Sequence, residues 1–278
     1  MISKKLMVVG AHADDIEFSA GGTCLKYHKL GYEIDYVMST NNMSGHLHFV
    51  ETGGVVVMHE CTPETMMPIR KSECDKAAAV VGAVPFHLDH PQRHYTAPDL
   101  SRVTEGYDVP SPSGIRLQAP PIMNAHEDSG SVERVANRIL EINPEAVLTH
   151  SQVTESPEHF ATAMLMLKGY LQAKKRGYEG MILFWNEMYE VSLLRDTFAP
   201  WNTFVDISDY RDAKNDFIRC HIAMVPCPER MEYQDFSGRC GCALAEPFAL
   251  GVFGSKPEPL GEFSEEIHRN FRGGPAGC

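Results

Sequence analysis

The chain has 278 residues, which suits one large α/β domain, and no linker composition divides it. Its net charge is −12 and its Lys and Arg residues form no large cluster, so nucleic acid is not expected as a partner. No uninterrupted apolar run approaches the ~20 residues that cross a bilayer, so we expect no membrane partner either.

Short apolar runs alternate with helical patterns along the first half of the chain. The sequence predicts strands over residues 6–9, 34–38 and 86–88, and helices over about 19–30 and 69–81. Gly31 and Gly82 follow the two helices, and glycine commonly ends a helix at this position. This alternation is typical of an α/β fold in which helices cover a mostly parallel sheet.

The second half of the chain continues the pattern after a long interruption. Residues 90–123 are rich in Pro, Ser and Gly and have little periodicity, so we expect a long loop excursion that forms a lid or binding loop. Beyond it the sequence predicts helices over 132–142, about 158–176 and 210–224, and strands over 146–149, 181–185 and 203–207. The tail after about residue 225 has many Gly, Pro and Cys residues and is expected to be irregular.

The eight cysteines are scattered along the chain, and the apolar stretch at the N-terminus is too short for a secretory signal. We therefore expect reduced thiols and a cytoplasmic location. Cys240 and Cys242 are the closest pair, but they lack the two-residue gap and the partner pair of a structural zinc site. The acidic net charge permits a homo-oligomer without requiring one.

Four polar residues follow the first predicted strand: His12, Asp14, Asp15 and Glu17. In open α/β sheets, ligands gather at the carboxyl ends of the parallel strands. Imidazole nitrogens and carboxylate oxygens are good zinc ligands, and a spacing of three residues lets His12 and Asp15 face the same side of a tight turn. Asp14 can then face the open coordination position and take a proton from water. The alternative is that the two aspartates only cap the following helix.

A catalytic zinc usually has three protein ligands, so a third ligand must come from elsewhere in the chain. Histidines that follow other predicted strands or precede helices are the candidates: His126, His150, His159 and the group His87, His90 and His94. The residue pattern leaves this choice open. The last group could form a second metal site, but neutral histidines near a cleft more often orient a substrate.

The segment from His12 to Glu17 resembles the AHPDDxE signature of the LmbE-like, or PIG-L, zinc deacetylases. Residues 69–82 are similar to the family helix that carries an Arg and a Glu, and residues 143–150 to the strand that enters the second motif. Residues 156–159, Ser-Pro-Glu-His, stand in the place of the family's HPDH. The similarity covers about the first 165 residues, and beyond them only Ala-Glu-Pro-Phe at 245–248 is similar to a family element.

This resemblance implies a three-layer α/β/α, Rossmann-like domain that removes acetyl groups from N-acetylglucosamine-type sugars or related amides. It implies that His12, Asp15 and His159 bind Zn²⁺. It also implies that Asp14 is the general base and that Arg70 holds a substrate hydroxyl or charge.

The chain departs from the family pattern at several positions. Ala13 replaces a proline, Glu158 replaces the Asp of HPDH, and Ser156 replaces its first His, which is thought to steady the charged transition state. His150, His126 or a histidine of the 87–94 group such as His94 could substitute and bind the substrate. Residues 41–46 also replace the Gly- and Glu-rich loop expected after the second strand, which points to an atypical substrate.

We therefore expect residues 1–278 to form one domain, a zinc-dependent hydrolase that cleaves the C–N amide bond of an N-acetylated small molecule. Two alternatives remain. One is a zinc-dependent hydratase or lyase on the same scaffold. The other is a metal-dependent binding protein without turnover, which would keep His12, Asp15 and His159 but would not need Asp14.

Overall fold

The computed structural model describes residues 4–50, 56–104, 119–186, 201–224 and 240–251. Within them a seven-stranded sheet has the order β10-β11-β9-β8-β1-β2-β5. Five of its strands run parallel: β1 (Lys5–Gly10), β2 (Glu33–Thr40), β5 (Phe86–His90), β8 (Ala146–His150) and β9 (Met181–Trp185). β11 (Ala245–Leu250) pairs antiparallel with β9 on one side and with β10 (Thr203–Asp206) on the other, so β10 again runs in the same direction as those five strands. The carboxyl ends of the parallel strands therefore share one edge of the sheet.

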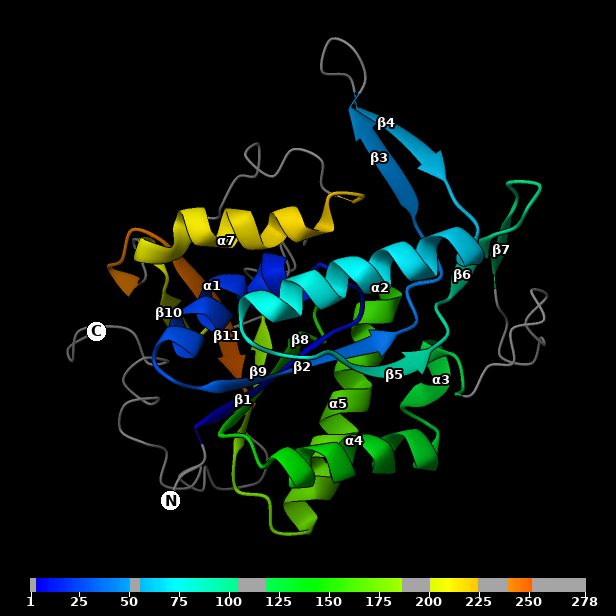
Figure 1. The fold of residues 1–278 in the computed structure, drawn as a ribbon. Helices are drawn as coiled ribbons and strands as arrows, with labels where there is room; N and C mark the ends of the chain where they lie inside the picture. Colours follow the sequence, from blue (N-terminus) through cyan, green and yellow to red (C-terminus); the bar gives the residue numbers. More distant parts are fainter. Residues whose placement is uncertain (1–3, 51–55, 105–118, 187–200, 225–239, 252–278) are drawn as a thin grey trace.

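Helices cover both faces of this sheet (Figure 1). One layer contains α1 (Asp15–Lys29), α2 (Pro63–Val80) and α7 (Arg211–Ile218), and the other contains α3 (Ile122–Ala125), α4 (Ser129–Ile142) and α5 (Pro157–Lys175). Because side chains alternate along a strand, Leu6 and Val8 of β1 enter the first core, whereas Met7 and Val9 enter the second. The expected three-layer α/β/α architecture with a mostly parallel sheet is confirmed.

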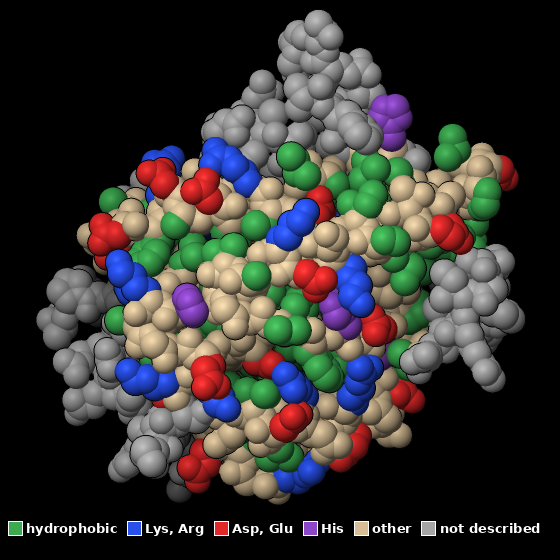
Figure 2. Space-filling model, viewed as in Figure 1, with side chains coloured by type: hydrophobic (Ala, Val, Ile, Leu, Met, Phe, Trp, Pro, Cys, Tyr) green, Lys and Arg blue, Asp and Glu red, His purple; other side chains and the backbone are tan. Residues whose placement is uncertain are grey.

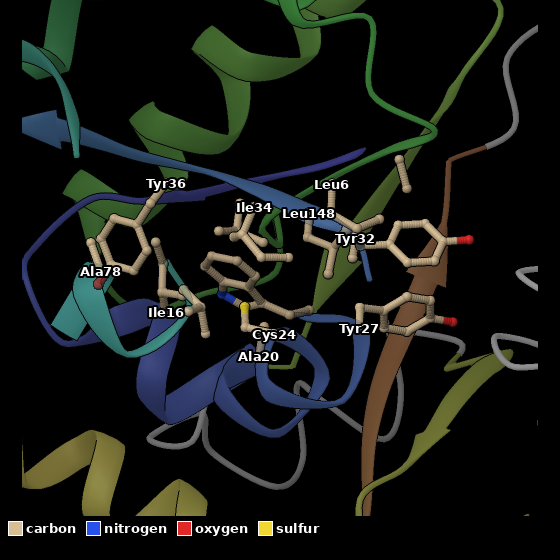
Figure 3. Packing of buried hydrophobic residues seen from close by; sticks show 14 of the residues in the cluster. Leu6, Ile16, Ala20, Cys24, Tyr27, Tyr32, Ile34, Tyr36, Ala78 and Leu148 are labelled. Atoms are coloured by element: carbon tan, nitrogen blue, oxygen red, sulfur yellow. The ribbon is translucent and has the colours of Figure 1, made fainter. Parts of the chain in front are cut away.

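The first core lies between the sheet and α1. Ile16, Ala20 and Cys24 of α1 belong to the same cluster as Tyr36 of β2, and all four are fully buried (Figure 3). α1 also lies close to Ile207, which follows β10, because Gly22 has no side chain and a Cβ there would lie 2.7 Å from Ile207. This packing fixes the start of α1 against the end of β1.

Two helices begin at least four residues earlier than the sequence predicts. α1 starts at Asp15 rather than near residue 19, because acidic residues are favourable in a first helical turn. α2 starts at Pro63 rather than near residue 69 and runs through Pro68. Proline inside a helix removes one hydrogen bond, but the buried side chains of Met66 and Arg70 hold this turn in place.

Several strands and one helix end differ from the prediction. Residues 90–123 contain the short hairpin β6 (His94–Thr96) and β7 (Arg102–Thr104), while residues 105–118 lie outside the described part. A second unpredicted hairpin joins β3 (His46–Val50) and β4 (Val56–Glu60). The last helix stops at Ile218 and continues as the 3₁₀ turn η2 (Arg219–His221), instead of reaching residue 224. Another 3₁₀ turn, η1 (Ser208–Tyr210), precedes it.

The tail after about residue 225, which was expected to be irregular, contains the strand β11. The sequence of β11 does not have the pattern of a strand. Pro247 cannot donate to a sheet and Glu246 is a buried charge, so neither signals a strand. The Nζ of Lys214 lies 2.6 Å from Glu246 Oε1, and the carboxylate accepts from the backbone N–H groups of Gly22 and Thr23. This buried ion pair ties β11 and α7 to α1.

Surface charges are mixed on the face shown in Figure 2, where acidic and basic side chains alternate without a continuous basic patch. In the part of the chain that the structure describes, no helix is both long and apolar enough to cross a bilayer. The single domain over residues 1–278 stays a prediction, since residues 252–278 lie outside the described part.

Candidate active site

The turn between β1 and α1 holds Asp14 in an unusual backbone conformation. Its φ of 115° and ψ of −29° lie in the left-handed region, although Asp14 carries a side chain. Such a residue costs on the order of 1–3 kcal/mol and persists only where its surroundings hold it. Asp14 occupies the N-cap position of α1, yet its carboxylate makes no capping hydrogen bond. The Asp15 carboxylate points back toward β1 and accepts a hydrogen bond from the backbone N–H of His12 at 2.6 Å. These contacts argue against helix capping as the reason for both aspartates.

His12, Asp15 and His159 bring three ligand atoms together at the carboxyl edge of the sheet. Nδ1 of His12 lies 3.2 Å from Nε2 of His159 and 3.4 Å from Oδ2 of Asp15. Nε2 of His159 lies 3.4 Å from the other carboxylate oxygen, Oδ1. In tetrahedral zinc sites, bonds of about 2.0–2.1 Å place neighbouring ligand atoms roughly 3.3 Å apart. The three residues therefore have the chemistry and the spacing to hold a zinc-sized ion.

This group meets the geometric requirements of a metal site, and no second group among the described residues does. Between 11% and 18% of each of the three side chains is exposed, so each is partly open to solvent. His12 and Asp15 come from the turn after β1, and His159 comes from the first turn of α5. His12 and His159 are 147 positions apart in the sequence. The parallel pairing of β1 with β8 brings the segments that follow these two strands, and with them the two histidines, close together.

A carboxylate holds the second nitrogen of the His12 ring. Oε2 of Glu158 lies 2.6 Å from His12 Nε2 and accepts from Gln92 Nε2 at 3.2 Å, while Oε1 accepts from the backbone N–H of Arg93. Metal-binding histidines commonly donate their other ring N–H to a carboxylate, which fixes the ring and its tautomer. Glu158 occupies that place for His12.

The pKa values of His12 and Glu158 follow from the contacts of these two side chains. Burial lowers the pKa of His12, but the charges and hydrogen bonds of Asp15 and Glu158 outweigh burial and raise it to about 9. Burial raises the pKa of Glu158, but the His12 contact and the hydrogen bonds from Arg93 and Gln92 lower it to about 2. A metal ion at His12 Nδ1 requires a neutral ring, so it would have to displace a proton.

The pKa values of the adjacent residues Asp14 and Asp15 are shifted in opposite directions. Burial raises the pKa of Asp14, and the Arg70 charge opposes this only in part. Burial acts on Asp15 too, but the surrounding histidines, with His159 the strongest, hold its pKa well below the usual range. Two carboxyl groups whose environments separate their pKa values are suited to different tasks, one as a permanent anion and one as a proton acceptor.

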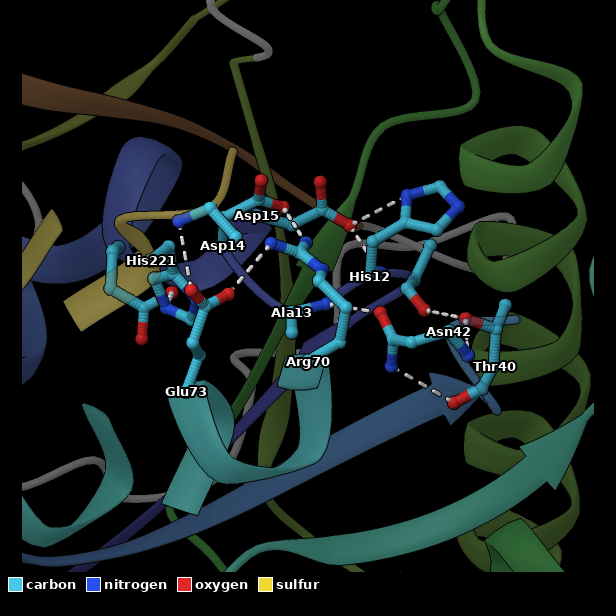
Figure 4. A network of polar contacts seen from close by, with 12 residues as sticks. His12, Ala13, Asp14, Asp15, Thr40, Asn42, Arg70, Glu73 and His221 are labelled. Atoms are coloured by element: carbon cyan, nitrogen blue, oxygen red, sulfur yellow. Dashed lines mark hydrogen bonds and ion pairs between the residues drawn. The ribbon is translucent and has the colours of Figure 1, made fainter. Parts of the chain in front are cut away.

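Arg70 is buried behind Asp14, with 2% of its surface exposed. Its Nη2 lies 3.1 Å from Asp14 Oδ1, and its Nη1 lies 3.4 Å from Glu73 Oε2 (Figure 4). The described contacts of Arg70 are thus with two carboxylates of the chain itself. Its role as a substrate ligand stays a prediction.

Of the three other histidines proposed for the substrate, only His150 contacts the metal-site group. Its ring stacks on His159 with 4.1 Å between centroids, and its Nε2 accepts from the Ala11 N–H at 2.9 Å. Oδ2 of Asp15 is also 3.1 Å from that nitrogen. Whether Nε2 accepts from Ala11 or donates to Asp15, it has no lone pair free for a metal ion.

The remaining two histidines have other neighbours. His126 lies at the C-cap of α3, with Nε2 3.8 Å from Glu127 Oε1. His94 begins β6, and its Nε2 accepts from Arg102. The ring of His90 is also engaged, because Nδ1 donates to the Pro120 carbonyl at 2.8 Å. The structure therefore does not assemble the 87–94 group into a metal site. Substrate binding by His94, His126 and His150 remains untested.

Two departures from the family pattern have local explanations. The Ala13 N–H donates to Asn42 Oδ1 at 2.8 Å, a bond that a proline at position 13 could not make. Asn42 thereby fixes the unusual loop after β2 against the turn. The Ser156 hydroxyl accepts from the His159 N–H at 3.4 Å as the N-cap of α5, so it supports the helix that carries His159.

Sequence reasoning missed three supporting residues of the site: Glu158, Gln92 and Asn42. It placed Glu158 at the Asp of the family's HPDH without giving it a contact, and it gave Gln92 and Asn42 no role. The one available signal was the position of Glu158 directly before His159. Contacts such as His12 with Glu158, 146 positions apart, depend on the sheet order and leave no local pattern.

Comparison with solved structures supports the same fold. The chain is similar to 4-carboxy-2-hydroxymuconate hydratase from Pseudomonas putida, with a TM-score of 0.63 and 19% identity over 91% of this chain and 98% of that one. It is similar to N,N'-diacetylchitobiose deacetylase from Pyrococcus horikoshii, with a TM-score of 0.59 and 17% identity over 89% and 84%. A deacetylase of teicoplanin biosynthesis gives a TM-score of 0.57 and 14% identity over 90% and 100%. At these identities the likeness shows the fold alone.

Comparison with curated protein sequences gives no match. The profile of the family described as PIG-L: GlcNAc-PI de-N-acetylase matches residues 7–169, which is more than half of the chain and includes β1, α1, α2, β8 and the start of α5. The predicted resemblance is therefore confirmed, and the chain belongs to the PIG-L (GlcNAc-PI de-N-acetylase) family.

Proposed function

We propose that the protein is a zinc-dependent hydrolase that removes the acetyl group from an N-acetylated small molecule, such as an amino sugar. The observation that carries this proposal is the set of 3.2–3.4 Å separations among the ligand atoms of His12, Asp15 and His159. Family membership supports the reaction type. The name of the diacetylchitobiose deacetylase supports N-acetylated sugars as the first substrates to test.

The residues present suit zinc better than magnesium or calcium. Two imidazole nitrogens and one carboxylate are a common catalytic zinc set, whereas magnesium and calcium prefer oxygen ligands. When bound, zinc would polarise the amide carbonyl and lower the pKa of water toward ~7. Asp15 remains an anion in this arrangement, and Glu158 keeps the His12 ring oriented.

Asp14 is the proposed general base. Its Oδ1 is paired with Arg70, which leaves Oδ2 as the oxygen that takes the proton from the attacking water. Burial favours the protonated form that results, and Asp14 can then return the proton to the leaving amine. Arg70 fixes the carboxylate during both transfers, so a single residue serves as base and then as acid.

A second candidate function is hydration of a carbon–carbon double bond. The Ser156 hydroxyl caps α5, so it supplies neither the charge nor the proton of the histidine that the family pattern has there. Addition of water to a double bond involves no leaving amine and is less dependent on such a group. The hydratase from Pseudomonas putida has the same fold, which favours testing this reaction beside the first.

The two reactions can be separated in one experiment. Zinc-loaded protein would be incubated with N-acetylglucosamine and N,N'-diacetylchitobiose, with acetate release measured, and with an unsaturated dicarboxylic acid, with loss of ultraviolet absorbance measured. Acetate release that depends on zinc would support the proposal. Absorbance loss alone would favour hydration, and zinc binding without either reaction would favour the binding protein.

Glu158→Gln should weaken zinc binding by about 10–100-fold, because a glutamine holds the His12 ring less firmly than a carboxylate does. Competition with a chromophoric chelator would measure the zinc affinity of both proteins. Glu155→Gln is the matched control, since Glu155 is exposed and three positions earlier. Equal zinc affinity in the Glu158 variant and the control would remove Glu158 from the supporting role.

A further inference from the structure

Three fully buried polar side chains lie behind the turn of Asp14 and have no part in the proposed mechanism: Glu17, Tyr36 and His221. The Tyr36 hydroxyl donates to Glu17 Oε1. Nε2 of His221 lies 3.1 Å from the other carboxylate oxygen, Oε2. Glu17 belongs to the first turn of α1, three positions after Asp14, whereas His221 comes from η2, more than 200 positions along the chain.

A second set of contacts joins the same C-terminal segment to Asp14. The Ala223 N–H donates to Glu73 Oε1 at 2.9 Å, and Glu73 Oε2 lies 3.4 Å from Arg70 Nη1. Arg70 in turn pairs with Asp14 at 3.1 Å, and Figure 4 shows His221 and Glu73 on the same side of Arg70. Residues 221–223 therefore contact Glu17, which lies in the helical turn that follows Asp14, and Glu73, which pairs with Arg70.

Burial makes these contacts energetically important. A buried carboxylate that loses its partner is strongly destabilised, so Glu17 and Glu73 depend on the groups around them. Both ring nitrogens of His221 are buried, and neither makes a hydrogen bond of good geometry in the described part of the chain. Buried polar atoms of this kind are rare in native proteins, and here the ring lies against Glu17 within ion-pair distance.

We propose that His221 is a positioning residue for Asp14. Its ring holds Glu17 at the start of α1, while Ala223 holds Glu73 and through it Arg70, and together they maintain the left-handed conformation of Asp14. This inference rests on the proposed function, because it assigns His221 a role relative to the general base. His221 lies outside residues 7–169, so the family-matched half receives this support from the C-terminal half.

Zinc-loaded His221→Leu and His221→Gln would be compared with wild type in N-acetylglucosamine hydrolysis. We expect kcat to fall at least tenfold in the leucine variant and at least threefold in the glutamine variant. KM should stay within twofold and zinc should stay at one ion per chain. Wild-type kcat in His221→Gln would overturn the inference, even if His221→Leu does not fold.

The double variant Lys214→Met with Glu246→Gln is the matched control. It replaces another buried pair that docks the C-terminal half on α1, through the Phe18 carbonyl and the backbone N–H groups of Gly22 and Thr23. It should lower the melting temperature and leave kcat within twofold of wild type. An equal loss of kcat in the control would show that His221 contributes only to stability, which would overturn the inference.

A crystal structure of zinc-loaded His221→Gln gives a readout that needs no turnover. We expect Asp14 Oδ1 to move beyond 4 Å, the limit of an ion pair, from Arg70 Nη2, or Asp14 to leave the left-handed region. An unchanged pair and backbone would contradict the inference. Because this result is independent of activity, absence of acetate release from wild type would count against the proposed function alone.

Discussion

Asp14→Asn should reduce the kcat of acetate release by about 10²–10⁴-fold, which is the usual contribution of a general acid–base group. Asparagine has nearly the same shape and can still accept a hydrogen bond from Arg70, but it cannot take a proton from water. The ligand atoms of His12, Asp15 and His159 are not altered by this change. We therefore expect the variant to retain zinc at the wild-type level, measured by elemental analysis.

Asp15→Asn is the natural comparison, since it makes the same chemical change at the adjacent residue. It should lose zinc as well as activity, because an amide oxygen is a weaker ligand than a carboxylate. Hydrolysis close to the wild-type rate in zinc-replete Asp14→Asn would refute the general base. Loss of zinc from Asp14→Asn would instead place Asp14 among the metal ligands.

His159→Ala should lower zinc affinity by at least about 10³-fold, more than the 10–100-fold that changes to supporting residues typically cost. The substitution removes one of three ligand nitrogen or oxygen atoms and leaves His12 and Asp15 facing each other. Acetate release should fall with the metal content. Dialysis against a chelator and titration with zinc would measure both quantities in the same preparation.

His150→Ala tests whether the removal of any histidine close to the site lowers zinc affinity as much as His159→Ala does. The His150 ring stacks on His159, but its Nε2 contacts the Ala11 N–H and Asp15. We expect its zinc affinity to stay within about tenfold of wild type, as for a supporting residue. If His159→Ala bound zinc normally and His150→Ala did not, the third ligand would have to be reassigned.

The sequence alone was sufficient to predict six of the seven strands of the central sheet. Short apolar runs such as 6–9 and 146–148 identified β1 and β8, since a strand buried on both faces is apolar at nearly every position. It was insufficient for β11, where Pro247 and the buried Glu246 break the apolar pattern. The partner that makes Glu246 tolerable, Lys214, is 32 positions away and could not be identified before the fold.

The candidate site was predictable only in part for the same reason. His12, Asp14 and Asp15 share one short turn, so their proximity follows from the local sequence. The third ligand, His159, was implied only by the family resemblance, because the residue pattern alone left His150, His126 and the 87–94 group open. His221 had no signal at all, because a single histidine in a helical pattern looks like any surface or core histidine.

X-ray absorption of the zinc-loaded protein tests the central claim most directly, because the edge and fine structure report the ligand atoms around the ion. We predict a shell of nitrogen and oxygen atoms at about 2.0–2.1 Å with imidazole scattering, and its loss in His159→Ala. A sulfur shell at about 2.3 Å would contradict the account, since it would place the zinc on cysteines instead of on His12, Asp15 and His159.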